Sequence, residues 1–370
     1  AGERVIRLPI SNRISENRVK SRPLIRNLLS ALKRVLRYFV PLFMRGRNDR
    51  AWRNALERQP AVAEATRGCD VVVASYGPMA PLLFGRYVAA MHDKPLVIDI
   101  RDSFQAKEGA AFFLSRRISR FLERRVLAEA AGRITVGKKL ARYLSAQYRL
   151  CFRAIYSGWK DEDVVSQSGT KRDRAEGDET PYLYYAGTIY PHQLEALSLV
   201  LCALKRFDEL RLRVRVLRDK TWRGLYNIVK EHGIGDRVDL LPPVSGTEVA
   251  EEMARSRGVL VLENLVPSEL RDGTVTGKLF GLLASGIPGI AVSSPTGEIR
   301  EIIQHVDGWY GASTEAEFVQ AVQGLQSGLE PSVDNAAIAS YHVSAQAKKL
   351  HGLLAASIAD RYEGAPCSNQ

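Results

Sequence analysis

Short apolar runs alternate with amphipathic stretches along most of the chain. Continuous apolar runs predict strands buried on both faces of a parallel sheet, and the amphipathic stretches predict the helices between them. In the first half, strands are predicted at 70–75, 95–100, 133–136 and 154–158, with helices at 81–93, 115–130 and 138–148. Beyond a polar stretch at 160–180, strands are predicted at 182–186, 212–217, 238–241, 258–263 and 288–292, with helices at 194–207, 222–233, 247–256, 278–285, 298–305, 315–325 and about 334–358.

This order predicts an α/β fold of two doubly wound, Rossmann-like domains that face each other across a cleft. We expect an N-terminal domain over 1–160, a linker or mobile loop over 161–180 and a C-terminal domain over 181–332. A terminal helix over 333–362 is expected to cross back to the N-terminal domain. Since such a domain usually opens with a buried strand, whereas this sequence starts at Ala1 and soon becomes helical, we expect an opening strand to be missing.

The composition mainly excludes several classes of protein. With 370 residues, 45% hydrophobic and 25% charged, the chain is neither disordered, collagenous nor a small disulfide scaffold. No apolar run reaches the roughly 18 residues of a membrane helix, and no secretory signal is found, so we expect a cytoplasmic protein. The four cysteines (Cys69, Cys151, Cys202, Cys367) lack a CxxC pair, which favours free thiols. Neither metal-ligand spacing nor a hydrolase motif is present, and no tightly bound cofactor is expected.

The positive charge is concentrated at the start of the chain. The net charge is +12, and residues 1–60 hold 15 basic and 4 acidic residues, which leaves the rest nearly neutral. Within 27–40, apolar side chains share one helical face, and Arg26, Lys33, Arg34 and Arg37 share the other. Residues 24–45 therefore either lie on an anionic membrane, at its cytoplasmic face, or form a packed helix with a solvated basic face. A phosphorylated substrate and nucleic acid are the other candidate anionic partners, but no nucleic-acid-binding motif accompanies the segment.

The most informative stretch is Arg271–Pro288 (RDGTVTGKLFGLLASGIP), in which a loop rich in Gly and Thr enters a helix near Thr276. A helix start offers phosphate free N–H groups and the positive end of the dipole, and Lys278 adds a charge. The stretch is not a Walker A loop, because Leu279 stands where Ser or Thr would hold Mg²⁺. The alternative is a capped helix with Lys278 on a solvated face.

Together with its surroundings, this stretch resembles the donor-site signature of GT-B glycosyltransferases of the family 4 kind. The similarity covers Thr276–Phe280, Leu282–Gly286, Pro288 and the Gly297–Glu298 pair. Further motifs of the family are matched, in order, by Val71–Pro78 (VVVASYGP), Pro95–Phe104 (PLVIDIRDSF), Ala131–Leu144, Tyr156–Trp159 and Tyr184–Tyr190 (YYAGTIY). The resemblance implies transfer of a sugar from a nucleotide-diphosphate sugar to a lipid-linked, glycan or phosphorylated acceptor, with retention and without a tightly bound metal.

The resemblance also implies site residues. It places the donor in the C-terminal domain, beside Gly187, Thr188, Arg218, Lys220, Val244, Thr276, Gly277, Lys278 and Glu298. Arg218 and Lys220 follow a predicted strand and add positive charge there; a solvated loop is the alternative. Arg101 and Asp102 end another predicted strand, where ligands bind in open α/β sheets. They align with a His-Asp pair of the family, so we expect them to be catalytic; the alternative is an ion pair that caps a helix.

Two positions depart from the family pattern. Its two donor-site glutamates, spaced E-x7-E, fall at Gly273 and Gly281, and the second normally hydrogen-bonds the nucleotide ribose. A catalytically silent GT-B protein that acts as a binding or scaffold subunit is therefore one alternative function. A nucleic-acid-binding protein that uses residues 1–60 is the other.

Overall fold

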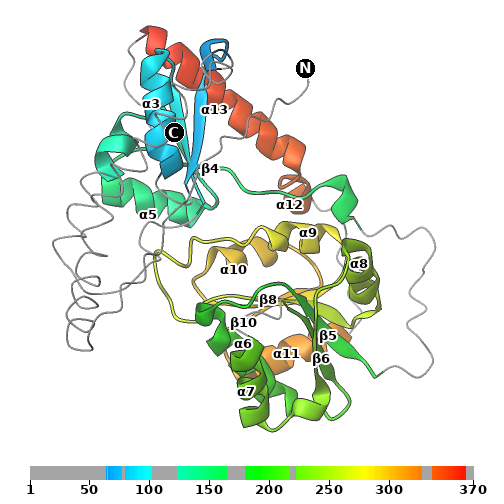
Figure 1. The fold of residues 1–370 in the computed structure, drawn as a ribbon. Coiled ribbons are helices and arrows are strands. Elements are labelled where there is room, and N and C mark those ends of the chain that lie inside the picture. Colours follow the sequence, from blue (N-terminus) through cyan, green and yellow to red (C-terminus); the bar gives the residue numbers. More distant parts are fainter. Residues whose placement is uncertain are drawn as a thin grey trace, which may run out of the picture. The chain divides into compact units, whose positions relative to one another are not determined.

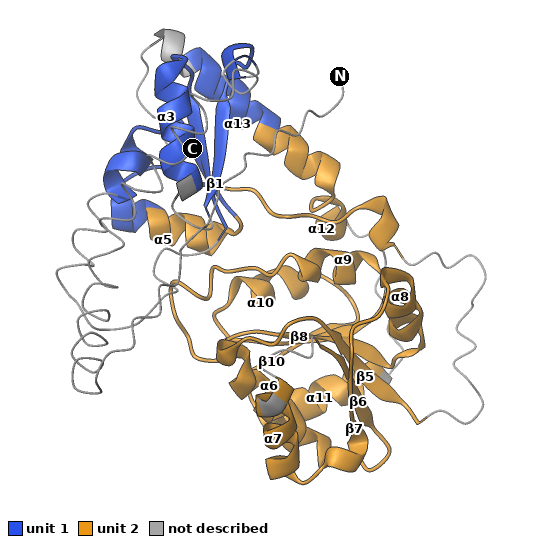
Figure 2. Ribbon diagram, viewed as in Figure 1, with its two compact units in different colours: residues 1–135, 145–153, 351–370 blue, residues 136–144, 154–350 orange. Residues whose placement is uncertain are grey.

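The computed structural model describes residues 64, 66–76, 80–101, 123–164, 180–216, 222–326 and 336–363 (Figure 1). The chain forms two compact units (Figure 2). Unit 1 comprises residues 1–135, 145–153 and 351–370, and unit 2 comprises 136–144 and 154–350. Each unit contains a sheet with parallel strands, which confirms the predicted α/β class. The predicted domain boundaries stay a prediction.

Unit 1 contains most of a four-stranded sheet in the order β1-β2-β3-β4. Its strands are β1 (Val72–Tyr76), β2 (Leu96–Ile100), β3 (Gly132–Thr135) and β4 (Arg153–Ala154), with helices α3 (Ala80–Met91) and α5 (Lys138–Tyr148) along the chain. Ala154 of β4 and residues 138–144 of α5 belong to unit 2. The first three strands are parallel, and all five residues of the central strand β2 are buried. This burial explains the continuous apolar run from which β2 was predicted.

The strand predicted at 154–158 is wrong beyond Ala154. The Tyr156 amide donates instead to the side-chain oxygen of Gln346 (3.0 Å), and the Trp159 amide donates to the carbonyl of Tyr341 (3.1 Å). The backbone therefore leaves the sheet because its hydrogen-bonding groups pair with the C-terminal part of the chain.

Unit 2 contains a six-stranded sheet in the order β10-β9-β8-β5-β6-β7. Its strands are β5 (Tyr182–Ala186), β6 (Arg211–Arg215), β7 (Val238–Leu241), β8 (Gly258–Leu262), β9 (Gly289–Val292) and β10 (Trp309–Ala312), all paired in parallel. Strand β10 is not predicted from the sequence, because Gly308 and Gly311 interrupt its apolar run. The strand order reverses between β5 and β8, which is where ligands bind in doubly wound sheets.

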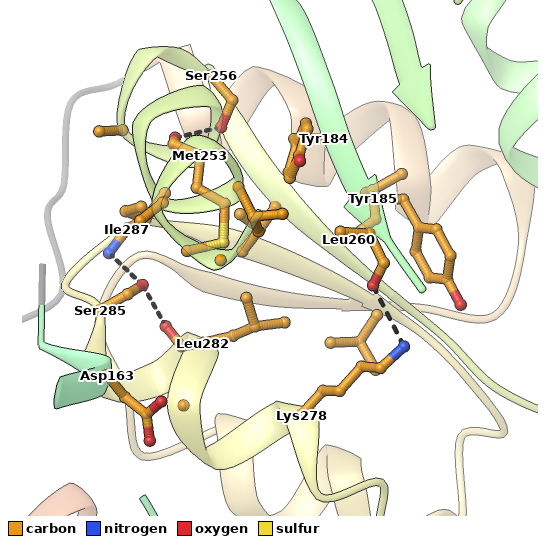
Figure 3. A pocket seen from close by; sticks show the side chains of 18 of the residues that line it. Asp163, Tyr184, Tyr185, Met253, Ser256, Leu260, Lys278, Leu282, Ser285 and Ile287 are labelled. Carbon is orange, nitrogen blue, oxygen red and sulfur yellow. Dashed lines mark hydrogen bonds between the residues drawn. The ribbon is translucent and has the colours of Figure 1, made fainter. Parts of the chain in front are cut away.

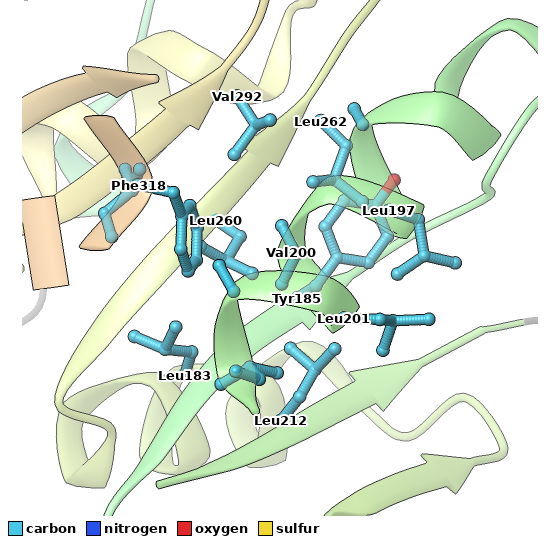
Figure 4. Packing of buried hydrophobic residues seen from close by; sticks show 14 of the residues in the cluster. Leu183, Tyr185, Leu197, Val200, Leu201, Leu212, Leu260, Leu262, Val292 and Phe318 are labelled. Atoms are coloured by element: carbon cyan, nitrogen blue, oxygen red, sulfur yellow. The ribbon is translucent and has the colours of Figure 1, made fainter. Parts of the chain in front are cut away.

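Alternating side chains of β8 show how this sheet is covered. Leu260 and Leu262 belong to a buried cluster with α6 (Leu194–Leu204), α7 (Trp222–His232) and α11 (Glu315–Gln326) (Figure 4). Val259 and Val261 point to a second cluster, formed with α9 (Lys278–Ala284) and α10 (Glu298–Ile303) and flanked by α8 (Gly246–Arg255). Because successive residues of a strand face opposite sides, each side of the sheet has its own core.

The C-terminal region is not the single helix predicted at about 334–358. It forms α12 (Ala336–Ala339) and α13 (Val343–Glu363). Between them the backbone pairs with Trp159, whose carbonyl accepts the Val343 amide at 2.8 Å. A continuous helix was wrong because this tertiary pairing and the bond from the Trp159 indole to the Ile338 carbonyl (2.8 Å) hold the chain in a turn.

Several predictions fall on residues outside the described ranges: the amphipathic helix at 27–40, Asp102, Arg218 and Lys220. The helix predicted at 115–130 is described only from residue 123, and 123–128 are helical. Cys69, Cys151 and Cys202 are free thiols. Within the described part of the chain, no helix has the length and apolar character needed to cross a bilayer.

Candidate functional site

A large cleft lies in unit 2 at the point where the strand order reverses. It has a volume of about 1780 Å³, which exceeds the roughly 300–1,000 Å³ of most small-molecule sites. Its walls are formed by β5, β8, α8, α9, the turn after β5 and the short helix η1 (Asp161–Asp163) (Figure 3). It therefore spans the place where the topology predicts a ligand.

Both polar and apolar side chains line the cleft. Thr188, Glu263, Thr276 and Lys278 line it near the carboxyl ends of β5 and β8. The apolar side chains that line it include Met253, Val259, Val261, Leu282 and Ile287. Lys278 supplies a cation near the carboxyl ends of β5 and β8, and charged side chains also line other parts of the cleft, namely Glu162, Asp163, Glu251, Arg255 and Arg257.

Lys278 lies across the turn that follows β5. Its ammonium nitrogen donates to the carbonyl oxygen of Ala186 at 3.2 Å and lies 5.7 Å from the ring centre of Tyr185. Gly187 has a φ of +142°, a conformation that favours glycine. A Cβ atom at Gly187 would come within 1.5 Å of the Lys278 ammonium nitrogen. The ammonium group fits here because residue 187 has no side chain.

The surroundings of Lys278 suit an anionic ligand. Desolvation lowers the pKa of Lys278, and the Glu263 carboxylate counteracts this to a smaller extent. Among the described residues, the hydrogen-bond partner of the ammonium is a neutral carbonyl. An anion bound beside it would stabilise the charged form and form a charge-assisted hydrogen bond.

The start of α9 adds backbone donors. The first backbone bond runs from the Leu279 amide to the Thr276 carbonyl at 3.1 Å, so the amides of Gly277 and Lys278 are not used within this helix. Gly277 also has no side chain to cover them, and a Cβ there would lie 3.4 Å from the Ser157 hydroxyl. Thr276, Gly277 and Lys278 all line the cleft.

The two glycines at the family's glutamate positions differ in their surroundings. A Cβ atom at Gly273 would lie 2.1 Å from the backbone nitrogen of Leu140, so the close approach of α5 excludes a side chain. A Cβ atom at Gly281 would lie 3.3–3.5 Å from the carboxyl atoms of Asp163. Position 281 therefore already has a carboxylate beside it, from another element. Asp163 was missed because it belongs to a polar stretch without periodicity.

Glu298 is buried and caps α5. Its two carboxylate oxygens accept the amides of Lys138 (2.6 Å) and Lys139 (2.8 Å), and the hydroxyl of Tyr156 donates to it as well. Burial and this bond to Glu298 raise the pKa of Tyr156. Both carboxylate oxygens are thus occupied within unit 2, and Glu298 does not line the cleft.

An ion pair supports one wall of the cleft. The guanidinium of Arg215 on β6 makes a two-bond contact with Glu252 on α8, in which Nε donates to Oε2 at 2.9 Å and Nη2 donates to Oε1. The hydrogen bond from Arg215 lowers the pKa of Glu252 more than any other interaction does. Because both side chains are largely buried, the pair joins α8 to the sheet.

The remaining predicted residues lie elsewhere. Arg101 is in unit 1, at the end of β2, where its Nε donates to Asp99 at 2.8 Å; the Ser75 hydroxyl donates to the same oxygen at 3.1 Å. Val244 is half-buried between β7 and α8 and does not line the cleft. The structure thus brings together Gly187, Thr188, Thr276, Gly277 and Lys278. Among the described residues, no group of three or more His, Cys, Asp or Glu side chains could hold a metal ion.

Comparisons with known proteins identify the fold. Neither a family model nor a curated protein sequence matches the chain. The apo lipopolysaccharide outer core galactosyltransferase WaaB is similar with a TM-score of 0.55 and 14% identity, over 85% of this chain and 80% of that one. Sucrose-phosphate synthase from Thermosynechococcus elongatus is similar with a TM-score of 0.50 and 13% identity, over 84% of this chain and 77% of that one. HepE from Anabaena, in complex with UDP and glucose, is similar with a TM-score of 0.50 and 16% identity, over 84% of this chain and 83% of that one. The chain has the GT-B fold that its sequence predicts.

Proposed function

We propose that the protein is a glycosyltransferase that takes its sugar from a nucleotide-diphosphate sugar bound in the cleft of unit 2. The observation that carries this proposal is the position of Lys278 across the side-chain-free turn at Gly187, at the end of a cleft large enough for such a donor. The similar HepE structure holds UDP and glucose, which supports a uridine nucleotide as the first ligand to test.

The proposed chemistry uses groups of this chain. The bond between the sugar and the distal phosphate breaks, a bond to an acceptor oxygen forms, and the acceptor proton passes to the departing phosphate. Negative charge grows on that phosphate in the transition state. Lys278 and the amides of Gly277 and Lys278 stabilise it, because preorganised donors act strongly in a partly desolvated site. Thr188 and Thr276 add hydroxyl groups at the same end of the cleft.

The proposal also assigns roles to three other predicted residues. We propose that Glu298 acts indirectly, by holding the start of α5, since both of its carboxylate oxygens are used there. Arg101 and Asp102 remain the proposed reacting pair for the acceptor side. A lipid-linked, glycan or phosphorylated acceptor, transfer with retention, and a place at the cytoplasmic face of a membrane complete the proposal.

The nucleotide site is tested by calorimetric titration with UDP, GDP and ADP. We expect Lys278→Ala to weaken binding of the preferred nucleotide by about 10–100-fold, as for the loss of a charged hydrogen bond. Lys230→Ala, which removes an exposed lysine from α7, is the matched control and is expected to bind normally. Equal affinity of the Lys278→Ala variant and the wild type would contradict the site.

A second assay separates the enzyme from a silent binding protein. Transfer and hydrolysis are measured with a panel of nucleotide sugars at saturating concentration. Turnover that falls in Lys278→Ala and not in Lys230→Ala supports the enzyme. Nucleotide binding without turnover of any donor would favour the binding or scaffold alternative.

A further inference from the structure

Asp163 stands where a side chain at position 281 would enter the cleft. It ends the short helix η1, and its Oδ2 accepts the amide of Lys160 at 2.8 Å, which holds the carboxylate in place. The same side chain lines the cleft beside α9 (Figure 3). Its other oxygen, Oδ1, accepts no hydrogen bond from a described residue and is available to a ligand.

The surface of α9 beside Asp163 carries no side chains, because glycines occupy it. Gly277 and Gly281 are four residues apart, so they lie on the same face of the helix, about 6 Å apart along its axis. One of them faces the hydroxyl of Ser157, and the other faces the carboxylate of Asp163. The Asp163 carboxylate therefore lies against a side-chain-free part of α9, whereas the Lys278 ammonium extends away from it to the turn after β5 (Figure 3).

The chemistry of the two residues differs. An ionised carboxylate only accepts hydrogen bonds, so Asp163 repels phosphate and selects groups that donate, such as hydroxyls. Lys278, in contrast, attracts phosphate. A ligand that contacts both residues carries a phosphate and, in another part of the molecule, hydroxyl groups.

We propose that Asp163 binds a hydroxyl pair of the donor and thereby makes the cleft selective for ligands with that diol. The inference rests on the proposed function, because the donor supplies both the phosphate and the hydroxyls. Two parts of a nucleotide sugar have suitable hydroxyls, namely the ribose and the sugar to be transferred. The chemistry of recognition is the same for both, and ligand variants distinguish them.

The test is calorimetric titration of the full chain with UDP, 2′-deoxy-UDP and UDP-glucose. We expect the wild type to bind ligands that carry the diol recognised by Asp163 more tightly than ligands that lack it. In Asp163→Ala, UDP binding should weaken by about tenfold, and the preference for UDP over 2′-deoxy-UDP should disappear if the ribose is the partner. If UDP and 2′-deoxy-UDP are unaffected, but the affinity gained by UDP-glucose over UDP disappears, the hexose is the partner.

Controls separate recognition from a structural role. Asp163→Asn keeps an oxygen for the Lys160 amide but loses the charge, so it should retain the wild-type melting temperature and show the same loss of selectivity. Asp161→Asn, on the same turn, changes a carboxylate that does not line the cleft and should bind like the wild type. Adding Gly281→Glu to Asp163→Ala returns a carboxylate from α9, and we expect partial recovery of the diol preference.

Three results would overturn the inference. One is that Asp163→Ala and Asp163→Asn bind all three ligands as the wild type does. Another is that the Asp163 variants lose affinity equally for every ligand and that adding Gly281→Glu restores none of it. This result would show that Asp163 only stabilises the turn at Lys160. If the wild type binds no nucleotide at all, the proposed function fails first and this inference fails with it.

Discussion

Three glycines of unit 2 differ in what occupies the space that a side chain would need. Gly187 admits the ammonium of Lys278, and Gly273 admits the backbone of Leu140. Gly281 leaves space that Asp163 borders from another element. The absence of a side chain therefore has a different structural reason at each of the three positions, and the distance from a Cβ atom to the nearest atom distinguishes them.

The contact at Gly187 gives a prediction at this scale. Gly187→Ala places a methyl group on the Lys278 ammonium and forces alanine into a conformation with φ of +142°. We expect nucleotide affinity to fall by at least tenfold, and the free energy of unfolding to fall by about 1–3 kcal/mol. Calorimetry and chemical denaturation measure the two effects.

Gly224→Ala is the matched control, since a Cβ atom there meets no atom within 4 Å. It lies in α7, where alanine is preferred to glycine, so stability should rise by about 0.5–1 kcal/mol with unchanged nucleotide binding. Normal binding by Gly187→Ala would show that Lys278 can leave the turn without loss.

The proposed reacting pair is tested by Asp102→Asn, which keeps the shape and removes the charge. We expect the transfer rate to fall by about 10²–10⁴-fold, as for the loss of general acid–base help, with nucleotide affinity and melting temperature little changed. Steady-state kinetics and thermal denaturation measure these quantities. A lower melting temperature with intact turnover would instead indicate a structural ion pair.

At the scale of elements, the cleft depends on how its wall helices are attached to the sheet. Helix α8 is held to β6 by the buried pair of Glu252 and Arg215. The first turn of α5 is held by Glu298 in the same unit. Both attachments use a carboxylate that is removed from water, so both depend on its charge.

The Glu252 pair predicts a dependence of stability on pH. The hydrogen bond from Arg215 holds the pKa of Glu252 below its ordinary value of 4.5 in the folded state. Its contribution is therefore fully present above about pH 4.5 and is lost as the pH falls through the folded-state pKa. We expect Glu252→Gln to lower the free energy of unfolding by about 1–3 kcal/mol at pH 7, and much less near pH 3. Urea denaturation at both pH values measures the difference.

Glu251→Gln is the control for this experiment, because Glu251 is exposed on the same helix. Its stability should follow the wild type at both pH values. A constant difference between Glu252→Gln and the wild type from pH 7 to pH 3 would show that packing, and not charge, accounts for the effect.

At the scale of the whole molecule, charge is distributed very unevenly. Residues 1–60 carry 15 basic and 4 acidic residues, whereas the remainder is close to neutral although the net charge is +12. Such a segment attracts an anionic surface, and each basic residue near a membrane contributes about 1 kcal/mol. The long-range part of this attraction is screened by salt.

We therefore predict that residues 24–45 bind vesicles that contain anionic lipid. The variant that tests this replaces Arg26, Lys33, Arg34 and Arg37 with Gln. Co-sedimentation with anionic vesicles should fall strongly, whereas neutral vesicles should bind little of either protein. A control that replaces four exposed basic residues of unit 2 should sediment like the wild type; these are Lys205, Arg206, Lys230 and Lys349. Equal sedimentation of the wild type and the fourfold variant would contradict membrane binding by residues 24–45.

Much of the architecture was determined by local sequence pattern. Strands β5 and β7 and helix α5 were predicted with the observed bounds, and the alternation of strand and helix correctly predicted the α/β class. The loop with Thr276 and Lys278 was also correctly predicted to enter a helix. These features depend on periodicity and turn residues within a few positions of each other, so the sequence displays them directly.

Only the tertiary structure decided which distant residues meet. The bond between Glu298 and Lys138 joins positions 160 apart, and neither residue carries a local sign of its partner. The same holds for Asp163 beside Gly281, and for the pairing with Trp159 that divides α12 from α13. Strand and helix patterns arise from the side on which each residue is buried, whereas these contacts arise from how separate elements pack, and packing is satisfied only in the folded chain.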